Sequence, residues 1–167
     1  MITDPQISQR SEQPTVGIRT RVTMEEFGQG VIPQLSGEVF GWLRQQGLAP
    51  AGPEFIRYHV IDMSGQMEVE IGVPVAPGVG GDGRVAAGTL PAGRYASLRY
   101  TGDYDGLMEA NRVLIDWAKA NAIAWDSRTD ERGDHFAARF ESYLVGPPDE
   151  PDPARWETDV LIRLAGA

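Results

Sequence analysis

The sequence of 167 residues contains no cysteine, only two histidines, and fewer basic than acidic side chains (15 against 24). Without cysteine the chain can form no disulfide, thiolate nucleophile, zinc–thiolate site or iron–sulfur cluster. Its formal net charge of -9 would repel a phosphate backbone, so we expect no direct binding to nucleic acid. The histidines, His59 and His135, have no metal-ligand spacing, and we expect neither a metal nor a cofactor.

Long apolar runs are also missing. No stretch is long enough to cross a bilayer, and the first ten residues (MITDPQISQR) lack the basic and apolar regions of a signal peptide. We therefore expect no membrane partner and a cytoplasmic location in a bacterial cell.

A glycine-rich stretch at residues 76–83 (APGVGGDG) contains the letters of the dinucleotide-binding fingerprint G-x-G-x-x-G. That fingerprint must open a helix whose N-terminus holds the pyrophosphate. Here the next residues, RVAAGTLPAG, include Gly88 and Pro91 and are typical of strand and turn. We interpret the stretch as a linker and not as a cofactor site.

Hydrophobic spacing predicts the same series of elements on both sides of this linker. The first series is a strand at 16–23, a helix at 28–48, and strands at 54–62 and 67–75 joined by the hairpin loop MSGQ. The second is extended structure at 84–102 with LPAG as a turn, a helix at 104–123, and strands at 139–147 and 157–165. A tryptophan lies late in each helix, Trp42 and Trp117.

This repetition predicts an α+β fold made by tandem duplication of a strand–helix–strand–strand unit. We expect one domain over 1–167, with pseudo-repeats at about 14–75 and 84–167, an antiparallel sheet, two main helices and a cleft between the halves. The competing topology is the ferredoxin-like β-α-β-β-α-β order, which predicts one strand fewer after each helix pair.

The strand at 139–147 (RFESYLVGP) has an acidic residue, Glu141, in its middle. On a strand, Phe140 and Leu144 share one face, and Glu141 and Tyr143 share the other. If Phe140 and Leu144 meet the helices, Glu141 looks out from the opposite face of the sheet. Two interpretations fit this spacing: a solvent-exposed acid on an edge strand, or a carboxylate that faces a ligand cavity.

An acid among aromatic side chains suits a lipophilic cation. Tyr58, Tyr143 and the helix tryptophans can supply aromatic walls, and a partly desolvated carboxylate seeks a positive partner. A cation over an aromatic face gains on the order of 2 kcal/mol when it is desolvated.

Four segments, in this order along the chain, resemble the GyrI-like family, also described as the effector-binding domain of bacterial transcription activators. They are FIRYHVID…MEVEIGVPV, LPAGRYASLRYTGDYDGLMEANRVLIDWAKAN, FESYLVGP and ETDVLIRLA. The most specific are the block PAGRYASLRYTGDYDGL (91–107) and the Glu-x-Tyr of 141–143. With the first strand and helix, the resemblance covers almost the whole chain.

The resemblance implies a hydrophobic pocket between the two halves, with an acidic residue at its floor that meets drug-like, often cationic aromatic ligands. On this sequence that role falls on Glu141, with Tyr143 beside it and Tyr58 from the corresponding strand of the first half. Tyr104 and Trp117 are further ligand-binding candidates.

Family members are similar in fold but differ in use: sensor halves of regulators, proteins that stand alone, gyrase-inhibitor-like proteins and hydrolases of cyclopropane-containing toxins. The short lead before Val16 argues against a fused DNA-binding domain. Our preferred hypothesis is a stand-alone multidrug-type module that senses or sequesters hydrophobic, cationic small molecules.

The alternative is a hydrolase in which Glu141 acts as general base on water and Tyr143 or Tyr58 steadies the developing charge. A third hypothesis is an interaction protein whose acidic surface blocks an enzyme partner such as a gyrase.

Overall fold

The computed structural model describes residues 1–62 and 64–166. The strands are β1 (Gln6–Arg10), β2 (Gln13–Thr23), β3 (Phe55–Ile61), β4 (Gln66–Pro74), β5 (Ala86–Leu90), β6 (Gly93–Thr101), β7 (Ser127–Asp130), β8 (Gly133–Phe136), β9 (Arg139–Val145) and β10 (Glu157–Arg163). The helices are α1 (Met24–Phe27), α2 (Val31–Gln46) and α3 (Leu107–Ala120), with single 3-10 turns η1 (Tyr104–Gly106) and η2 (Pro153–Arg155).

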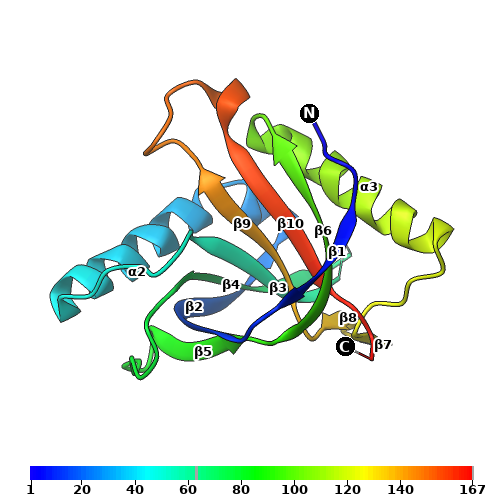
Figure 1. The fold of residues 1–167 in the computed structure, drawn as a ribbon. Coiled ribbons are helices and arrows are strands. Elements are labelled where there is room, and N and C mark those ends of the chain that lie inside the picture. Colours follow the sequence, from blue (N-terminus) through cyan, green and yellow to red (C-terminus); the bar gives the residue numbers. More distant parts are fainter. Residues whose placement is uncertain (63, 167) are drawn as a thin grey trace.

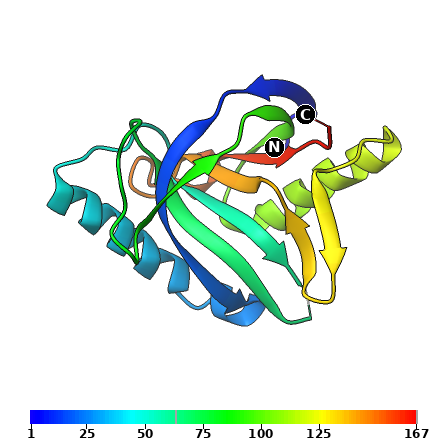
Figure 2. The same cartoon turned by 90° about the horizontal axis from the view of Figure 1, so that it is seen from below.

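One antiparallel sheet curls into a half-barrel, and α2 and α3 both lie on the same side of it (Figures 1 and 2). Helix α2 packs on β2 and β4, and α3 packs on β6 and β10. The predicted α+β class is therefore confirmed. No helix in the described part of the chain combines the length and apolar character needed to span a bilayer.

The strand order is β1-β6-β10-β9-β3-β4-β2-β5, with the hairpin β7–β8 attached to β3. Strands β3 and β9 are neighbours at the centre, and the series β9-β10-β6 on one side mirrors β3-β4-β2 on the other. We call the β3–β9 pairing the seam. The mirror order follows the predicted repetition of elements, whereas the exact limits of the repeats remain a prediction.

The edge strands are exchanged between the two halves. Strand β1 precedes the first unit in sequence but pairs with β6 of the second, and β5 follows the linker but pairs with β2 of the first. The chain turns directly from β1 into β2 at residues 11–12 and from β5 into β6 at residues 91–92. These bends let the sheet curl over on itself (Figure 2).

The curl produces an apolar interior on each face of the sheet. On the helix side, one cluster under α2 includes Val39, Leu43, Val69 and Ile71, and a second under α3 includes Ala110, Leu114, Val160 and Ile162. Inside the curl, a third cluster consists of Phe55, Leu90, Tyr95, Ala138, Phe140 and Leu161.

Both long helices form where the apolar period predicted them. The buried positions of α2 are Leu35, Val39, Trp42 and Leu43, and those of α3 are Leu107, Ala110, Leu114 and Ala118. Gly47 ends α2 with a φ of 67°, as expected for a glycine at this position.

Strand β1, the β7–β8 hairpin, the short helix α1 and the 3-10 turn η2 were not predicted, because little apolar patterning marks such short or polar segments. Strand β1 (QISQR) has a single large apolar residue, Ile7, which is itself exposed. The β7–β8 hairpin lies in a polar segment, where Asp130 accepts hydrogen bonds from the side chains of Arg128 and His135 and from the backbone N–H of Arg132. In the predicted MSGQ loop, Met63 lies outside the described residues.

Candidate functional site

Glu141 lies on a central strand of the sheet and not on an edge. Its strand β9 runs between β10 and β3, where Glu141 pairs with Val160 on one side and Ile56 on the other. The residue is 5% exposed. The edge-strand interpretation, with the acid in open solvent, is therefore wrong, and the carboxylate lies at the seam between the two halves.

Glu141 was expected to point away from the helices, but it points toward them. Glu141 and Tyr143 face the helices, whereas Phe140 lies inside the curl with Phe55 and Tyr95 at ring-centroid distances of 6.1 and 5.9 Å. The expectation assumed that apolar residues of the strand must meet the helices. Because the sheet encloses a second interior, a large apolar residue can be buried on either face.

Three uncharged donors surround the Glu141 carboxylate. Oε1 accepts hydrogen bonds from the hydroxyl groups of Tyr58 (3.1 Å) and Tyr143 (2.7 Å). Oε2 accepts one from Nδ2 of Asn111 at 2.9 Å. These donors come from β3, β9 and α3, so both halves of the molecule contribute to the same carboxylate.

A basic side chain, Arg139, is linked to this carboxylate through the amide of Asn111, and its charge also acts on the carboxylate through space. Arg139 Nη2 donates to Oδ1 of Asn111 at 3.2 Å, and Asn111 in turn donates to Glu141. The Arg139 guanidinium lies over the ring of Phe136, 4.9 Å from its centroid, and burial lowers the pKa of this arginine. Within the described residues, Glu141 thus has hydrogen bonds but no direct ion pair.

The two tyrosines at the carboxylate remain protonated donors. Burial raises the pKa of Tyr58 well above its ordinary value, and the negative charge of Glu141 raises it further. The pKa of Tyr143 is raised well above its ordinary value by the same two causes. Neither hydroxyl loses its proton near neutral pH, so both keep donating to the carboxylate.

Aromatic rings lead outward from the buried acid. Tyr104 meets the Tyr143 ring edge-on at 5.6 Å and lies 4.8 Å from the Trp156 ring. On the other side, the Phe27 and Tyr58 rings are 6.2 Å apart. Tyr104 is 39% exposed, so the outer end of this row of rings reaches solvent.

A second carboxylate, Glu54, stands directly before β3. Ser36 Oγ of α2 donates a hydrogen bond to its side chain, and burial raises the pKa of Glu54. Burial also raises the pKa of Tyr104, and the charges of Glu54, Asp149 and Glu141 raise it further. The negative charges of three carboxylates therefore reach the hydroxyl group of Tyr104.

The structure brings most of the predicted residues together. Glu141, Tyr58 and Tyr143 are hydrogen-bonded to one another, and Tyr104 is one ring away. Trp117 packs against the cluster under α3. It lies six residues beyond Asn111, which is about 9 Å farther along the helix and about two-thirds of a turn round it. Its role in ligand binding remains a prediction.

Sequence reasoning missed Asn111, Glu54, Phe27 and the contact of Trp156 with Tyr104. Only Asn111 had a clear signal: it follows Leu107 by four residues and precedes Leu114 by three, so an amide stands in the apolar stripe of α3. In the described part of the chain, no three His, Asp or Glu side chains gather as a metal site would require.

A buried acid bordered by aromatic rings, at the seam of a duplicated α+β sheet, indicates a small-molecule-binding domain. The family model of the GyrI-like small molecule binding domain matches residues 3–165, and the chain belongs to this family. The predicted resemblance is thereby confirmed. A comparison with curated proteins gave no match.

Solved structures share the fold. The crystal structure of the EcmrR C-terminal domain has a TM-score of 0.74 at 20% identity and covers 98% of both chains. The cryo-EM structure of the EcmrR–DNA complex in EcmrR-RPo gives 0.75 at 21%, covering 96% of this chain and 57% of that one, so this chain spans little more than half its length. The structure of SAV2435 bound to tetraphenylphosphonium gives 0.62 at 13%, covering 98% and 95%.

Proposed function

We propose that this protein binds hydrophobic organic cations at Glu141 and thereby senses or sequesters them. The observation that carries the proposal is the composition of the carboxylate's surroundings: its donors are two hydroxyls and an amide, none of them charged. A ligand cation would supply the direct countercharge.

The energetic argument concerns the cost of burying an acid. Removing a carboxylate from water is expensive, and neutral hydrogen bonds compensate only part of that cost. A cation that reaches Glu141 gains Coulomb attraction in a medium of low dielectric constant. Its apolar substituents can also contact the rings of Tyr104, Tyr143 and Tyr58, each worth about 0.5–2 kcal/mol to a cation.

The charges around the entrance to the site also favour a positively charged ligand. Glu54 and Asp149 lie near enough to Tyr104 to raise its pKa, so a positive ligand meets further negative charge outside the buried acid. The cation in the SAV2435 structure, tetraphenylphosphonium, is of this chemical class and is a suitable probe.

The test compares a cation with a neutral molecule of similar shape. Tetraphenylphosphonium and triphenylphosphine oxide are titrated by calorimetry into wild type, Glu141→Gln and the control Glu109→Gln, an exposed acid on α3 that pairs with Arg112. We expect the cation to bind more tightly than the oxide in wild type. Glu141→Gln should weaken cation binding about 10- to 100-fold, as expected when a buried charge partner is removed, and Glu109→Gln should leave it unchanged.

Equal affinity for the two probes, or an unchanged cation affinity in Glu141→Gln, would refute the proposal. The hydrolase alternative is tested on the same proteins by incubation with a cyclopropane electrophile and mass spectrometry. Because both oxygens of Glu141 already accept side-chain hydrogen bonds, binding is the better-supported use of this carboxylate.

A further inference from the structure

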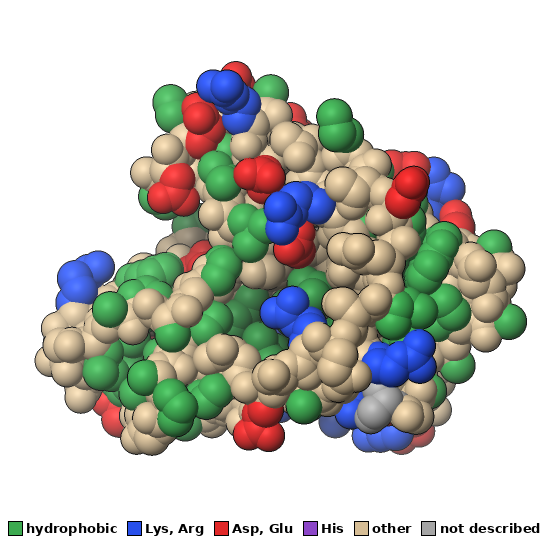
Figure 3. Space-filling model, in the orientation of Figure 1, with side chains coloured by type: hydrophobic (Ala, Val, Ile, Leu, Met, Phe, Trp, Pro, Cys, Tyr) green, Lys and Arg blue, Asp and Glu red, His purple; other side chains and the backbone are tan. Residues whose placement is uncertain are grey.

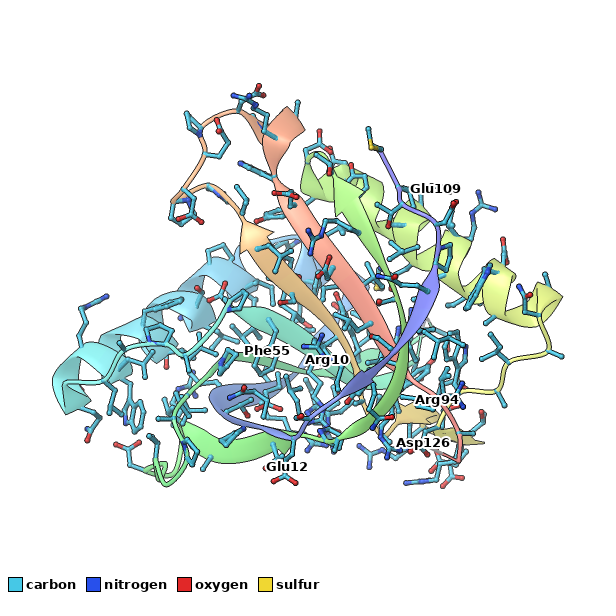
Figure 4. All side chains as sticks on the ribbon, in the orientation of Figure 1. Arg10, Glu12, Phe55, Arg94, Glu109 and Asp126 are labelled. Atoms are coloured by element: carbon cyan, nitrogen blue, oxygen red, sulfur yellow. The ribbon has the colours of Figure 1, made fainter. Side chains whose placement is uncertain are left out.

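The curl of the sheet leaves a half-open hollow on the face away from the helices. Its volume is about 420 Å³, within the range of small-molecule pockets. Phe55, Leu90 and Phe140 lie along its floor, and its lining also includes Arg10, the last residue of β1, and Glu12 of the β1–β2 bend. Figure 3 shows apolar side chains gathered in this hollowed area around a basic group, and Figure 4 places Arg10 close to Phe55.

The base of the hollow consists of tightly packed apolar side chains. Phe55 is 1% exposed and Phe140 is 2% exposed. The Phe140 ring contacts both Phe55 and Tyr95 edge-on, which fixes the three rings as one rigid surface. Because so little of each ring is exposed, the rings support the hollow from below, and a ligand would touch only their outermost atoms.

The charge around this floor is positive, in contrast to the chain as a whole. The Arg10 guanidinium lies 5.9 Å from the Phe140 ring centroid and 6.0 Å from that of Tyr95. Burial raises the pKa of Tyr95, and the charges of Arg163, Arg57 and Arg10 all oppose that rise. Three guanidinium groups therefore act on one buried hydroxyl.

Acidic side chains neutralise this charge only in part. Asp126 pairs with Arg163, and Glu12 lies at the rim. Arg57 donates to the backbone oxygens of Thr89 and Ala137, and its buried Nε has no hydrogen-bond partner.

Arg10 forms no ion pair with any carboxylate among the described residues, and its guanidinium stands at the mouth of the hollow. Glu70 acts on Arg57 only through space, since the Glu70 side chain itself is hydrogen-bonded to His59. The hollow thus combines a base of apolar side chains with the guanidinium of Arg10, which has no carboxylate partner among the described residues.

We propose that this hollow is a second ligand site, which binds an aromatic monocarboxylate. The carboxylate pairs with Arg10, and the apolar ring fills the hollow above the buried side chains of Phe55, Phe140 and Leu90. The site takes ligands of the opposite charge to those proposed for Glu141 and is separated from it by the thickness of the sheet. It depends on none of the residues that hold the Glu141 carboxylate.

The test titrates 1-naphthoate and the neutral analogue 1-naphthylmethanol into wild type, Arg10→Gln and Arg94→Gln by calorimetry. Arg94 is the matched control, because it is an exposed arginine on β6, the strand that pairs with β1, and lies outside the lining of the hollow. We expect Arg10→Gln to weaken naphthoate binding roughly three- to tenfold, the range of a partly exposed charge-assisted contact. Binding of naphthylmethanol, and of naphthoate to Arg94→Gln, should not change.

A second measurement locates the ligand without any mutation. Naphthoate should shift the amide NMR signals of Phe140, Ser142 and Arg10, and it should still bind when tetraphenylphosphonium is present. Equal affinity of naphthoate and naphthylmethanol in wild type would overturn the proposal. So would an unchanged affinity in Arg10→Gln, or competition between naphthoate and the phosphonium cation. None of these results depends on whether Glu141 binds cations.

Discussion

Strand β9 presents opposite chemistry to the two faces of the sheet. Toward the helices it carries Glu141 and Tyr143, an acid and a hydroxyl joined to donors from both halves. Toward the curl it carries Phe140, which lies beneath the guanidinium of Arg10. Among the described residues, one face has a buried negative charge without a direct ion pair, and the other has an exposed positive charge without one.

The difference shows how a curled sheet uses the alternation of a strand. In a flat sheet covered on one side, alternate residues are apolar inside and polar outside. Here both faces of the sheet are buried, so the alternation of apolar and polar residues does not tell which face holds a functional side chain. Each face can then hold a site of its own, and the following changes test how independent the two faces are.

The largest effect is expected from removing the aromatic floor. Phe140→Ala deletes a buried ring that contacts Phe55 and Tyr95, and it should lower the free energy of unfolding by about 3–5 kcal/mol, as for other buried Phe→Ala changes. Urea denaturation measures the loss. If the faces are independent, cation affinity in the folded variant is retained; a parallel collapse of cation binding would show that they are coupled.

A smaller loss is expected on the helix face from Asn111→Ala. This change removes one donor from the buried carboxylate and also the link to Arg139, so the free energy of unfolding should fall by about 1–3 kcal/mol. Saturating tetraphenylphosphonium should restore more stability to this variant than naphthoate does, in thermal melts. The comparison between faces would fail if naphthoate restored as much.

The smallest effect is expected from Glu54→Gln, which should raise the free energy of unfolding where the previous two changes lower it. Because burial raises the pKa of Glu54 in the folded protein, the ionised side chain opposes folding above its unfolded-state pKa. That penalty disappears as the pH falls through the folded-state pKa and below the unfolded-state value.

The variant should therefore be more stable than wild type at pH 7, by less than about 1 kcal/mol, and equal to it at low pH. It should also bind tetraphenylphosphonium about two- to fivefold more weakly, since a partly screened charge near the ligand is lost. Melts at pH 7 and pH 4 distinguish this from a general packing change, which would persist at both.

Sequence patterns predicted the elements whose stability comes from apolar periodicity. Helices α2 and α3 and the paired strands β3 and β4 were found in this way, and the alternation of an acid with a tyrosine pointed to Glu141 and Tyr143. The resemblance to the GyrI-like family placed Tyr58, from the corresponding strand of the first half, at the same pocket, but its hydrogen bond to Glu141 was not predicted.

Other features had no local signal. Strand β1 has no apolar alternation because its side chains are exposed, and it exists through backbone pairing with β6. The reversed face of Phe140 depends on the curl, which arises from the exchange of β1 and β5 between the halves. No single segment of the chain contains that information.

The exchanged edge strands also bear on how the chain behaves when it is severed. A break within residues 76–83 would leave two fragments that remain hydrogen-bonded through β1–β6 and β2–β5 as well as through β3–β9. Because Tyr58 would belong to one fragment and Glu141 to the other, a cation at that carboxylate would favour their reassembly. The fold thus offers a natural division point for a complementation reporter whose signal depends on the ligand.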